Sequence, residues 1–341
     1  MSPVIRECQR RGIDYFILHS GQHYSYEMDG IFFAELGLPD AKYNLDVGSG
    51  SHAEETAKIL TGAEKIMAEE KPDIVLVEGD TNTVLAAALA AVKLGIKVGH
   101  VEAGLRSGDR SMPEEINRCL TDHISDYLFA PTEEAKQNLL AEGIDAKKIF
   151  FTGNTIVDAV YQGLDIAKNQ SDSLSKLNLK KGGYFVVTAH RQENVDVKPK
   201  LKGILDGLKL IYDRFNLPVV FSIHPRTRKK LDESGLDIPD GVRLITPPGF
   251  IGFLQLEEGA KLILTDSGGV QEEACILRVP CVTLRENTER PETLQAGANI
   301  LAGTSPEKIL ECAETMLGRD RDWQNPFGGG DAAKRIIEVI A

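Results

Sequence analysis

Three acidic residues in the first half of the chain lie in short polar motifs of the kind that carries acid–base chemistry. Asp80 lies in Glu-Gly-Asp-Thr-Asn-Thr, Glu102 in His-Val-Glu-Ala-Gly-Leu-Arg-Ser and Glu114 in Met-Pro-Glu-Glu-Ile-Asn-Arg. If these carboxylates share a dry cleft, mutual repulsion and burial raise the pKa of at least one, so that an acid and a base coexist near neutral pH. The sequence therefore predicts general acid–base catalysis.

A helix is expected to begin at Pro113, because proline suits the first helical position. Glu114 then lies in the first turn, with Arg118 on the same face one turn later. Attraction to the helix N-terminus is the alternative role for Glu114, and it is the only role that we predict for Glu115.

A second motif, Asp-Ser-Gly-Gly-Val-Gln-Glu-Glu at 266–273, is typical of a phosphate-binding turn. It follows the apolar run at 261–265 and precedes Ala-Cys-Ile-Leu-Arg, which predicts a strand, a tight glycine turn and a helix. A helix N-terminus presents unpaired N–H donors, and Gly268 and Gly269 leave room beside them. A phosphate or diphosphate is therefore expected against Ser267 and Gly268. The alternative is that the first two residues of the motif only cap the helix.

Two carboxylates, Glu272 and Glu273, lie one turn further into the same expected helix. A carboxylate there can accept hydrogen bonds from the neighbouring hydroxyls of a sugar, and the alternative is that both side chains are solvated. The motif thus predicts contacts to both a diphosphate and a sugar.

The elements that position these residues alternate between β-rich runs and amphipathic stretches, which predicts an α/β fold with parallel sheets. Expected strands of a first series are Asp14 to Leu18, Asp73 to Val77, Lys97 to Val101, Tyr127 to Phe129 and Ile149 to Phe151. Those of a second series are Tyr184 to Thr188, Val219 to Ser222, Val242 to Ile245, Leu262 to Thr265 and Cys281 to Leu284. A polar, serine-rich stretch between the series predicts domains at 1–168 and 180–322, and a helix within 326–341 that can cross back to the first domain.

Six polar residues each follow the carboxyl end of an expected strand: His19, Asp80, Glu102, His190, His224 and Asp266. Ligands of open α/β sheets bind outside those ends, so we expect two Rossmann-like, doubly wound domains that face each other across a cleft. One such residue is usually a cap or a turn former, whereas six together favour a site.

The composition excludes several classes of protein. The chain has 341 residues, 42% of them hydrophobic, and a formal net charge of −12, which argues against nucleic acid or an anionic membrane as a partner. No apolar run is long enough for a membrane span, so we expect a cytoplasmic protein with its five scattered cysteines reduced. His19 and His23 could hold zinc only on a helix, which Gly21 disfavours, so no metal is expected.

Eight motifs together resemble the non-hydrolysing UDP-N-acetylglucosamine 2-epimerases, in that family's order and over the whole chain. They are His19-Ser-Gly-Gln-His23, Gly79-Asp-Thr-Asn82, His100-Val-Glu-Ala-Gly-Leu-Arg106, Pro113-Glu-Glu-Ile-Asn-Arg118, Thr188-Ala-His-Arg-Gln-Glu-Asn194, His224-Pro-Arg226, Asp266-Ser-Gly-Gly-Val-Gln-Glu-Glu273 and Thr288-Glu-Arg-Pro-Glu292. The resemblance implies a glycosyltransferase-B-type fold, a homodimer, UDP held mainly by the second domain, and neither NAD nor an essential metal. It also implies reversible interconversion of UDP-N-acetylglucosamine and UDP-N-acetylmannosamine through 2-acetamidoglucal.

The resemblance also implies roles for single residues. Asp80, Glu102 and Glu114 match the acid–base carboxylates, His190 a histidine near the leaving diphosphate, and Arg118 a neighbouring cleft arginine. Ser267 and Gly268 match diphosphate contacts and Glu273 the ribose contact, and Gly269, His224 and Arg226 complete the expected substrate-binding set. Gln22 and His23 resemble positions where regulated members hold a second UDP-N-acetylglucosamine.

Other functions use the same fold or the same substrate. A retaining glycosyltransferase would place an acceptor where the three carboxylates lie, and turnover of UDP-N-acetylglucosamine without an acceptor excludes it. A hydrolysing epimerase releases free UDP and N-acetylmannosamine, so the nucleotide status of the product separates the two epimerases. A non-catalytic sensor of nucleotide sugars is a third alternative.

The chain opens at Met1-Ser-Pro-Val-Ile-Arg-Glu-Cys, which predicts a helix with proline at its start. A doubly wound domain begins with a central strand, and members of the resembled family have one that ends in Gly-Thr-Arg-Pro-Glu and is followed shortly by a lysine. We therefore expect a shortened sequence that is poorly stable and weakly active. Each unpaired buried backbone group costs about 1 to 3 kcal/mol, against a total stability of about 5 to 15 kcal/mol.

Overall fold

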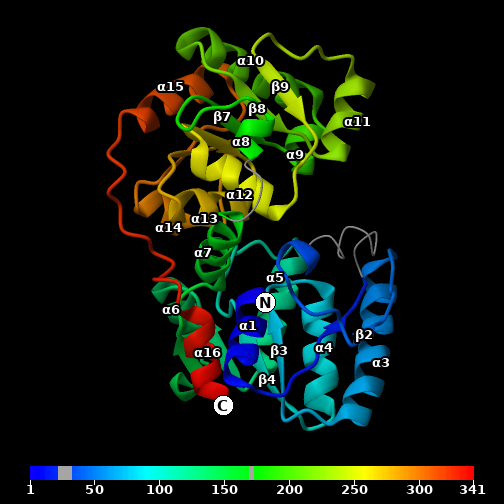
Figure 1. The fold of residues 1–341 in the computed structure, drawn as a ribbon. Helices are drawn as coiled ribbons and strands as arrows, with labels where there is room; N and C mark the ends of the chain where they lie inside the picture. Colours follow the sequence, from blue (N-terminus) through cyan, green and yellow to red (C-terminus); the bar gives the residue numbers. More distant parts are fainter. Residues whose placement is uncertain (22–32, 169–172) are drawn as a thin grey trace. The chain divides into compact units, whose positions relative to one another are not determined.

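The structure, a computed structural model, describes residues 1–21, 33–168 and 173–341. Contacts divide the chain into two units, Met1–Ala159 with Phe327–Ala341, and Val160–Pro326 (Figure 1). Each unit contains parallel strands joined by helices, so the predicted α/β class is confirmed.

The first unit contains a four-stranded parallel sheet in the order β3-β4-β5-β6. Its strands are β3 (Ile74–Glu78), β4 (Lys97–Val101), β5 (Tyr127–Ala130) and β6 (Ile149–Phe151). A separate parallel pair is formed by β1 (Leu18–His19) and β2 (Tyr43–Asn44). Because β3 and β4 pair directly and run in the same direction, the turns that follow them lie side by side at one edge of the sheet.

The strands of this unit are connected by amphipathic helices. They are α1 (Ser2–Arg11), α3 (His52–Glu70), α4 (Asn82–Lys93), α5 (Pro113–Ile124), α6 (Glu133–Ala141), the start of α7 (Thr155–Ala167) and α16 (Ala332–Ile340). α3 begins at a capping box, in which the Ser51 hydroxyl accepts from the Glu54 N–H and the Glu54 carboxylate accepts from the Ser51 N–H. α4 is rich in alanine, so α3 and α5 both pack closely against it.

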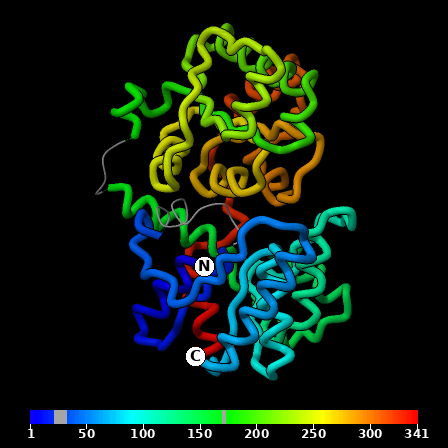
Figure 2. The backbone as a smooth tube through the Cα atoms, turned by 90° about the vertical axis from the view of Figure 1, so that its right-hand side faces the viewer, coloured from blue at the N-terminus to red at the C-terminus, as the bar shows by residue number. Residues whose placement is uncertain are grey.

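The last helix of the chain, α16, belongs to the first unit and packs beside α1. Figures 1 and 2 show the two helices, in red and dark blue, side by side. Val4 and Ile336 lie in one apolar cluster between them. Asp158 accepts hydrogen bonds from the N–H groups of Ala332 and Ala333, each at 3.1 Å, and so satisfies the N-terminus of α16.

The second unit contains a six-stranded parallel sheet in the order β12-β11-β10-β7-β8-β9. Its strands are β7 (Phe185–Thr188), β8 (Val219–Ser222), β9 (Val242–Ile245), β10 (Leu262–Thr265), β11 (Cys281–Thr283) and β12 (Asn299–Leu301). The strand order reverses between β7 and β10. The carboxyl ends of these two strands therefore form a topological switch point, the place where α/β sheets bind ligands.

Helices cover this sheet, and its central strands are fully buried, as in parallel sheets that are covered on both faces. The helices are the end of α7, α8 (Ser173–Lys176), α9 (Gln192–Val195), α10 (Lys198–Phe215), α11 (Pro225–Ser234), α12 (Phe250–Gly259), α13 (Gly268–Ile276), α14 (Pro291–Gln295) and α15 (Pro306–Leu317).

The largest differences from the expected strands lie at three places, whereas four other strands differ from the expected ranges by one residue at one or both ends. Of the strand expected from Asp14 to Leu18, only Leu18 pairs, together with His19, because its partner β2 is two residues long. The strands β2 and β12 escape prediction, because runs of two or three residues are too short to show a period.

The structure bears on two further features of the chain, its cysteines and its longest apolar helices. All five cysteines are free thiols, and four of them are buried, as predicted. Burial raises the pKa of Cys275 to about 12, which makes this thiol unreactive near neutral pH. In the described part of the chain, no helix has the length and apolarity that a membrane crossing requires.

Candidate active site

The turns after β3 and β4 bring Asp80 and Glu102 to the same edge of the first unit. Gly79 has a φ of 87°, and a Cβ built on it would lie 3.8 Å from Glu102 Oε2, so the Glu102 carboxylate lies against this turn. Glu102 itself has a φ of 68°, in the left-handed region that favours glycine. Such strain persists only where surrounding contacts enforce it, and it is concentrated at functional sites.

Two residues of α5 hold Asp80 in place. The Arg118 guanidinium makes an ion pair with the Asp80 carboxylate, and Asn117 Nδ2 donates to the Asp80 carbonyl oxygen at 3.0 Å. Arg118 also pairs with Glu115, Nη1 to Oε2 at 2.8 Å, rather than with Glu114, which shares its expected helix face. Both the backbone and the side chain of Asp80 are therefore positioned by this helix.

Glu115 has a role that its sequence position does not indicate. It is buried, and its carboxylate accepts hydrogen bonds from the N–H groups of Ser107, at 2.9 Å, and Gly108, at 3.0 Å. Burial raises the pKa of Glu115, but these hydrogen bonds and the charge of Arg118 outweigh burial and lower it. The prediction that Glu115 only stabilises the helix N-terminus is wrong, because the Glu115 carboxylate also holds the loop before α5 through these hydrogen bonds. Glu114 is exposed in the first turn of α5.

His100 on β4 connects the turns after β3 and β4. The ring is fully buried, with Nε2 2.8 Å from the Gly79 carbonyl oxygen and Nδ1 2.6 Å from Oδ1 of Asp122 on α5. Carbonyl and carboxylate oxygens only accept, so both ring nitrogens donate when Asp122 is ionised. The other Asp122 oxygen accepts from the Gly104 N–H at 3.1 Å and pairs with Arg106 at 2.8 Å. This network fixes the backbone on either side of Asp80 and Glu102.

Replacing His100 by Phe is expected to lower the free energy of unfolding by about 3 kcal/mol or more. The variant keeps most of the ring volume, but the buried Asp122 loses a partner and the Gly79 carbonyl becomes an unpaired acceptor. Chemical denaturation followed by circular dichroism measures the loss. The matched control is His123→Phe at an exposed position of α5, which is expected to change stability by less than about 0.5 kcal/mol. Equal losses would show that the hydrogen bonds of His100 contribute nothing.

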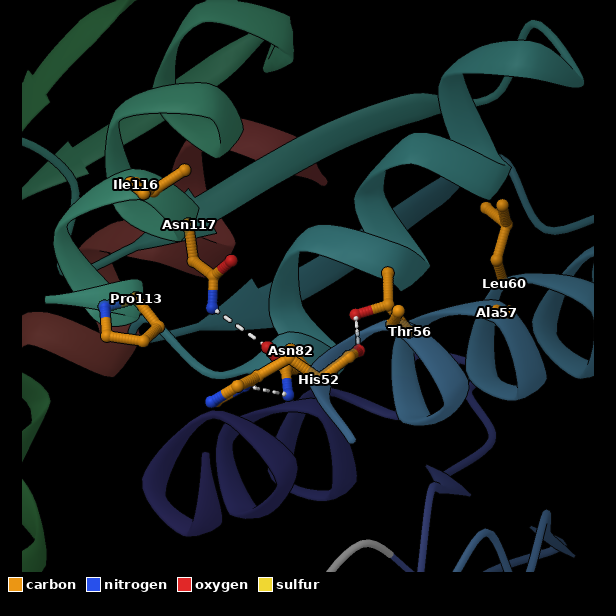
Figure 3. A pocket seen from close by; sticks show the side chains of 9 residues that line it. His52, Thr56, Ala57, Leu60, Asn82, Pro113, Ile116 and Asn117 are labelled. Carbon is orange, nitrogen blue, oxygen red and sulfur yellow. Dashed lines mark hydrogen bonds between the residues drawn. The ribbon is translucent and has the colours of Figure 1, made fainter. Parts of the chain in front are cut away.

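A pocket of about 420 Å³ lies among α3, α4 and α5 of the first unit, and Figure 3 shows Asn117 and Asn82 joined by a hydrogen bond among its lining residues. Asn82 Nδ2 donates to Glu55 Oε2 at 2.9 Å, and Asn117 Nδ2 donates to Asn82 Oδ1 at 3.3 Å. The described residues that line it include no lysine or arginine, so this lining does not suit a diphosphate. They are His52, Ala53, Thr56, Ala57, Leu60, Asn82, Pro113, Ile116 and Asn117.

In the second unit, Asp266 connects the turns after β7 and β10. It is fully buried and accepts hydrogen bonds from the N–H groups of His190 and Arg191, each at 3.0 Å, and from Asn194 Nδ2 at 3.1 Å. The interpretation of Asp266 as a cap of the following helix is therefore wrong. Because β7 and β10 flank the switch point, these bonds fix both turns at the place where a ligand is expected.

The glycine turn after β10 leads directly into α13, and the Ser267 side chain makes no capping hydrogen bond to it. A Cβ built on Gly269 would meet nothing within 4 Å, so approach to the helix N-terminus is open there. The guanidinium carbon of Arg290 would lie 3.9 Å from a Cβ built on Gly268. A helix N-terminus with open access and an adjacent arginine has the chemistry of a diphosphate site.

The two glutamates of α13 lie in different environments. Glu272 is buried and makes an ion pair with Arg290, Nε to Oε1 at 2.8 Å, so its carboxylate is engaged within the protein. Glu273 is half-buried and lies one turn after Gly269 on the same helix face. Burial raises the pKa of Glu273 to about 7. Of the two, Glu273 is the candidate for a sugar contact.

Two histidines lie at the carboxyl ends of β7 and β8, with the ring centroids of His190 and His224 6.0 Å apart. His224 caps α11 with Nδ1, which accepts from the Arg226 N–H at 3.2 Å. Burial and then the charges of His190 and Arg226 lower the pKa of His224. The Arg226 guanidinium pairs with Asp196 at 2.5 Å, whereas the His190 side chain is 41% exposed. The Arg226 side chain is similarly exposed, at 36%, so a ligand can reach both side chains.

Comparison with known proteins identifies the family. The model of the UDP-N-acetylglucosamine 2-epimerase family matches residues 6–341. This chain belongs to that family.

The family's members include close relatives of the chain. The UDP-N-acetylglucosamine 2-epimerase of Methanocaldococcus jannaschii is 56% identical over 100% of this chain and 94% of its own length. A crystal structure of the M. jannaschii enzyme in complex with UDP-GlcNAc and UDP matches with a TM-score of 0.91, 56% identity and coverage of 99% of this chain and 95% of that one. A UDP-2,3-diacetamido-2,3-dideoxy-D-glucuronate 2-epimerase of Pseudomonas aeruginosa is 41% identical over 98% of this chain and 93% of its own length. The resemblance to UDP-N-acetylglucosamine 2-epimerases is confirmed.

The structure adds one residue to the site expected for this epimerase family and leaves others untested. Arg290 becomes a candidate site residue, and it lies in the motif at 288–292 that the sequence singles out. Gln22 and His23, the possible regulatory positions, lie outside the described residues. Among the residues that are described, no group of three or more His, Cys, Asp or Glu side chains could hold a metal ion.

Proposed function

We propose that the chain reversibly epimerises UDP-N-acetylglucosamine to UDP-N-acetylmannosamine at C2 of the sugar. In the first step a carboxylate removes the C2 proton as the bond from C1 to the diphosphate oxygen breaks, which yields UDP and 2-acetamidoglucal. In the second step an acid returns a proton to the opposite face of C2, and the diphosphate oxygen re-forms its bond to C1. Electrons and atoms balance without an oxidant or reductant.

Asp80, Glu102 and Glu114 are the proposed acid–base groups. The position of Asp80 and Glu102 on adjacent turns supports this assignment, as does the strained backbone of Glu102. Arg118 is the proposed positioning residue for Asp80, because the two side chains form an ion pair.

UDP is proposed to bind the second unit, with its diphosphate against Ser267, Gly268 and Gly269. The observation that carries the proposal is the uncapped N-terminus of α13 at the switch point, with Arg290 beside it. His190 is proposed to lie near the leaving diphosphate, and Glu273 to accept hydrogen bonds from the ribose. His224 and Arg226 are further proposed contacts.

UDP is expected to bind the purified protein equally well with and without a chelator, because the proposed contacts are backbone N–H groups and arginine rather than a bridging metal. Isothermal titration calorimetry with UDP, in the presence and absence of EDTA, measures this. Binding that disappears with the chelator would replace the metal-free site by a metal-dependent one. No binding under either condition would remove the proposed UDP site.

The product separates the proposed reaction from its alternatives. Incubation with UDP-N-acetylglucosamine alone, followed by NMR, is expected to show UDP-N-acetylmannosamine in equilibrium with the substrate. Free N-acetylmannosamine with UDP would indicate a hydrolysing epimerase. A strict requirement for a sugar or lipid acceptor would indicate a glycosyltransferase.

A diacetamido uronate sugar is the second candidate substrate, favoured by the 41% identity to the P. aeruginosa enzyme. We propose UDP-N-acetylglucosamine first, because the identity to the M. jannaschii enzyme is higher, at 56%. A comparison of kcat/KM for the two UDP-sugars decides between them.

A homodimer is proposed for the chain as for the family that it resembles. The exposed apolar side chains of Ile116 and Leu120 on α5 support an interface at this helix. Analytical ultracentrifugation measures the oligomeric state.

A further inference from the structure

Glu257 of α12 is a fully buried carboxyl group that belongs to none of the motifs of the site. Within the described residues, no N–H, amide or cationic donor reaches either of its oxygens. Its carboxyl group lies against that of Glu273 on α13, close enough to share a proton, although neither oxygen of Glu257 meets a hydrogen-bond donor. Two ionised carboxylates only accept hydrogen bonds, so the pair must hold a proton.

The proton resides on Glu257 because that side of the pair is shielded from water. Glu257 is 0% exposed, whereas Glu273 is half-buried, and a charge costs most where burial is complete. Burial and then the charge of Glu273 raise the pKa of Glu257 well above its ordinary value. The hydrogen bond from Glu257 lowers the pKa of Glu273 against the larger effect of burial.

In the described ranges of the chain, no cationic side chain contacts Glu257. On α13 the neighbouring Glu272 raises the pKa of Glu273, and the charge of Glu272 is itself paired with Arg290. On β11 the thiol of Cys281 lies near Glu257, and burial keeps that thiol neutral. Other titratable groups on the neighbouring elements include the Tyr184 hydroxyl, which donates to the Leu256 carbonyl oxygen at 2.7 Å, Lys176 of α8, which is exposed, and Glu292, which raises the pKa of Glu272.

We propose that Glu257 is a positioning residue of the nucleotide site, which keeps its proton and donates it in a hydrogen bond to Glu273. This holds the Glu273 carboxylate ionised and oriented to accept hydrogen bonds from the ribose hydroxyls of UDP. The inference rests on the proposed UDP site. Glu273 lies one turn after Gly269 on the same face of α13, so a ligand whose diphosphate meets the helix N-terminus extends toward Glu273.

The pair has a pH dependence whose sign follows from Glu273. As the pH falls through about 7, Glu273 takes up a second proton, and because a neutral acid accepts more weakly than a carboxylate, UDP affinity falls. Stability changes in the opposite direction. The folded pKa of about 7 lies above the ordinary 4.5, so the folded state binds more protons between these values, and the contribution of Glu273 to stability is lost as pH rises through this window.

Two near-isosteric variants separate the hydrogen bond from packing. In Glu257→Gln the amide N–H donates to Glu273 at every pH, and UDP affinity at about pH 7.5 is expected within about twofold of wild type. In Glu257→Met the donor is lost while the volume is kept. UDP affinity is expected to fall about 10-fold or more, with the acid-side inflection of affinity moved to higher pH.

The control ligand is 2′,3′-dideoxy-UDP, which has the diphosphate and the base but no ribose hydroxyls. Calorimetric titration of this ligand is expected to give the same affinity for wild type and Glu257→Met. If Glu257→Met weakens both nucleotides equally, or if Glu257→Gln behaves like Glu257→Met, Glu257 acts by packing and the inference is overturned.

A measurement without any ligand keeps the test independent of the proposed function. The infrared difference spectrum of wild type minus Glu257→Gln at about pH 7.5 is expected to contain the C=O band of a protonated carboxylic acid. Absence of that band overturns the inference, even if UDP binds. If the band is present but wild type fails to bind UDP, the proposed UDP site is wrong and the positioning role is overturned with it.

Discussion

Changing Asp80, Glu102 or Glu114 to its amide is expected to slow epimerisation about 10²- to 10⁴-fold, while UDP affinity stays within a few-fold. An amide keeps the size of the side chain but can neither remove nor return the C2 proton. The proposed UDP contacts lie in the other unit of the chain, so they are left intact. Exchange of the C2 proton with deuterated solvent, followed by mass spectrometry, measures the proton-transfer step directly.

Two controls separate the loss of proton transfer from a change in surface charge and from a loss of stability. Glu134→Gln changes an exposed glutamate of α6 in the same way and is expected to leave the rate unchanged. The Asp80 variant also weakens the ion pair with Arg118, so its unfolding midpoint is measured beside its rate. Undiminished exchange in all three amide variants would mean that other groups transfer the proton.

Changing Asp266 to Asn is expected to lower the free energy of unfolding by about 3 kcal/mol and to weaken UDP binding at least about 10-fold. Asp266 is fully buried, and its oxygens accept from the N–H groups of His190 and Arg191. In the amide, an NH₂ group replaces one of the accepting oxygens. This NH₂ group is a donor and cannot accept from the backbone N–H groups. The same hydrogen bonds fix the turns after β7 and β10. Their loss is therefore expected to distort the proposed diphosphate site as well as to destabilise the protein.

Denaturation and UDP titration of the same preparation measure both effects. The matched control is Asp237→Asn, at an exposed position of the second unit, with an expected stability change below about 0.5 kcal/mol. If Asp266→Asn binds UDP as wild type does, the turns after β7 and β10 do not form the nucleotide site.

The sequence predicted the parts of the fold that leave a local pattern. The strands from Lys97 to Val101, from Val219 to Ser222 and from Leu262 to Thr265 agree with the structure residue for residue, and the helix expected to begin at Pro113 does begin there. Their apolar runs and helix starts are encoded within a few neighbouring residues. β2 escaped prediction, because pairing with a distant strand, rather than its own sequence, makes Tyr43–Asn44 a strand.

The candidate site was predictable only as a set of positions. Asp80, Glu102, His190 and Ser267 follow strand ends, and parallel topology places such residues at one edge of each sheet. What each side chain contacts was not predictable. Glu114 and Glu115 are adjacent and chemically alike, yet one is exposed and the other is buried among hydrogen bonds from the loop before α5.

The sequence by itself determined the α/β class, the family and the turns at which chemistry is expected, because each depends on short motifs in a specific order. Only the tertiary structure decided which groups are partners: His100 with Asp122, Asp266 with the backbone after β7, and Glu257 with Glu273. The two partners of each pair lie in different helices, strands or turns. No local sequence pattern predicts that they will be in contact. Packing brings the groups together, and burial then determines where the proton or charge resides, because the cost of an ion depends on the water that the fold excludes.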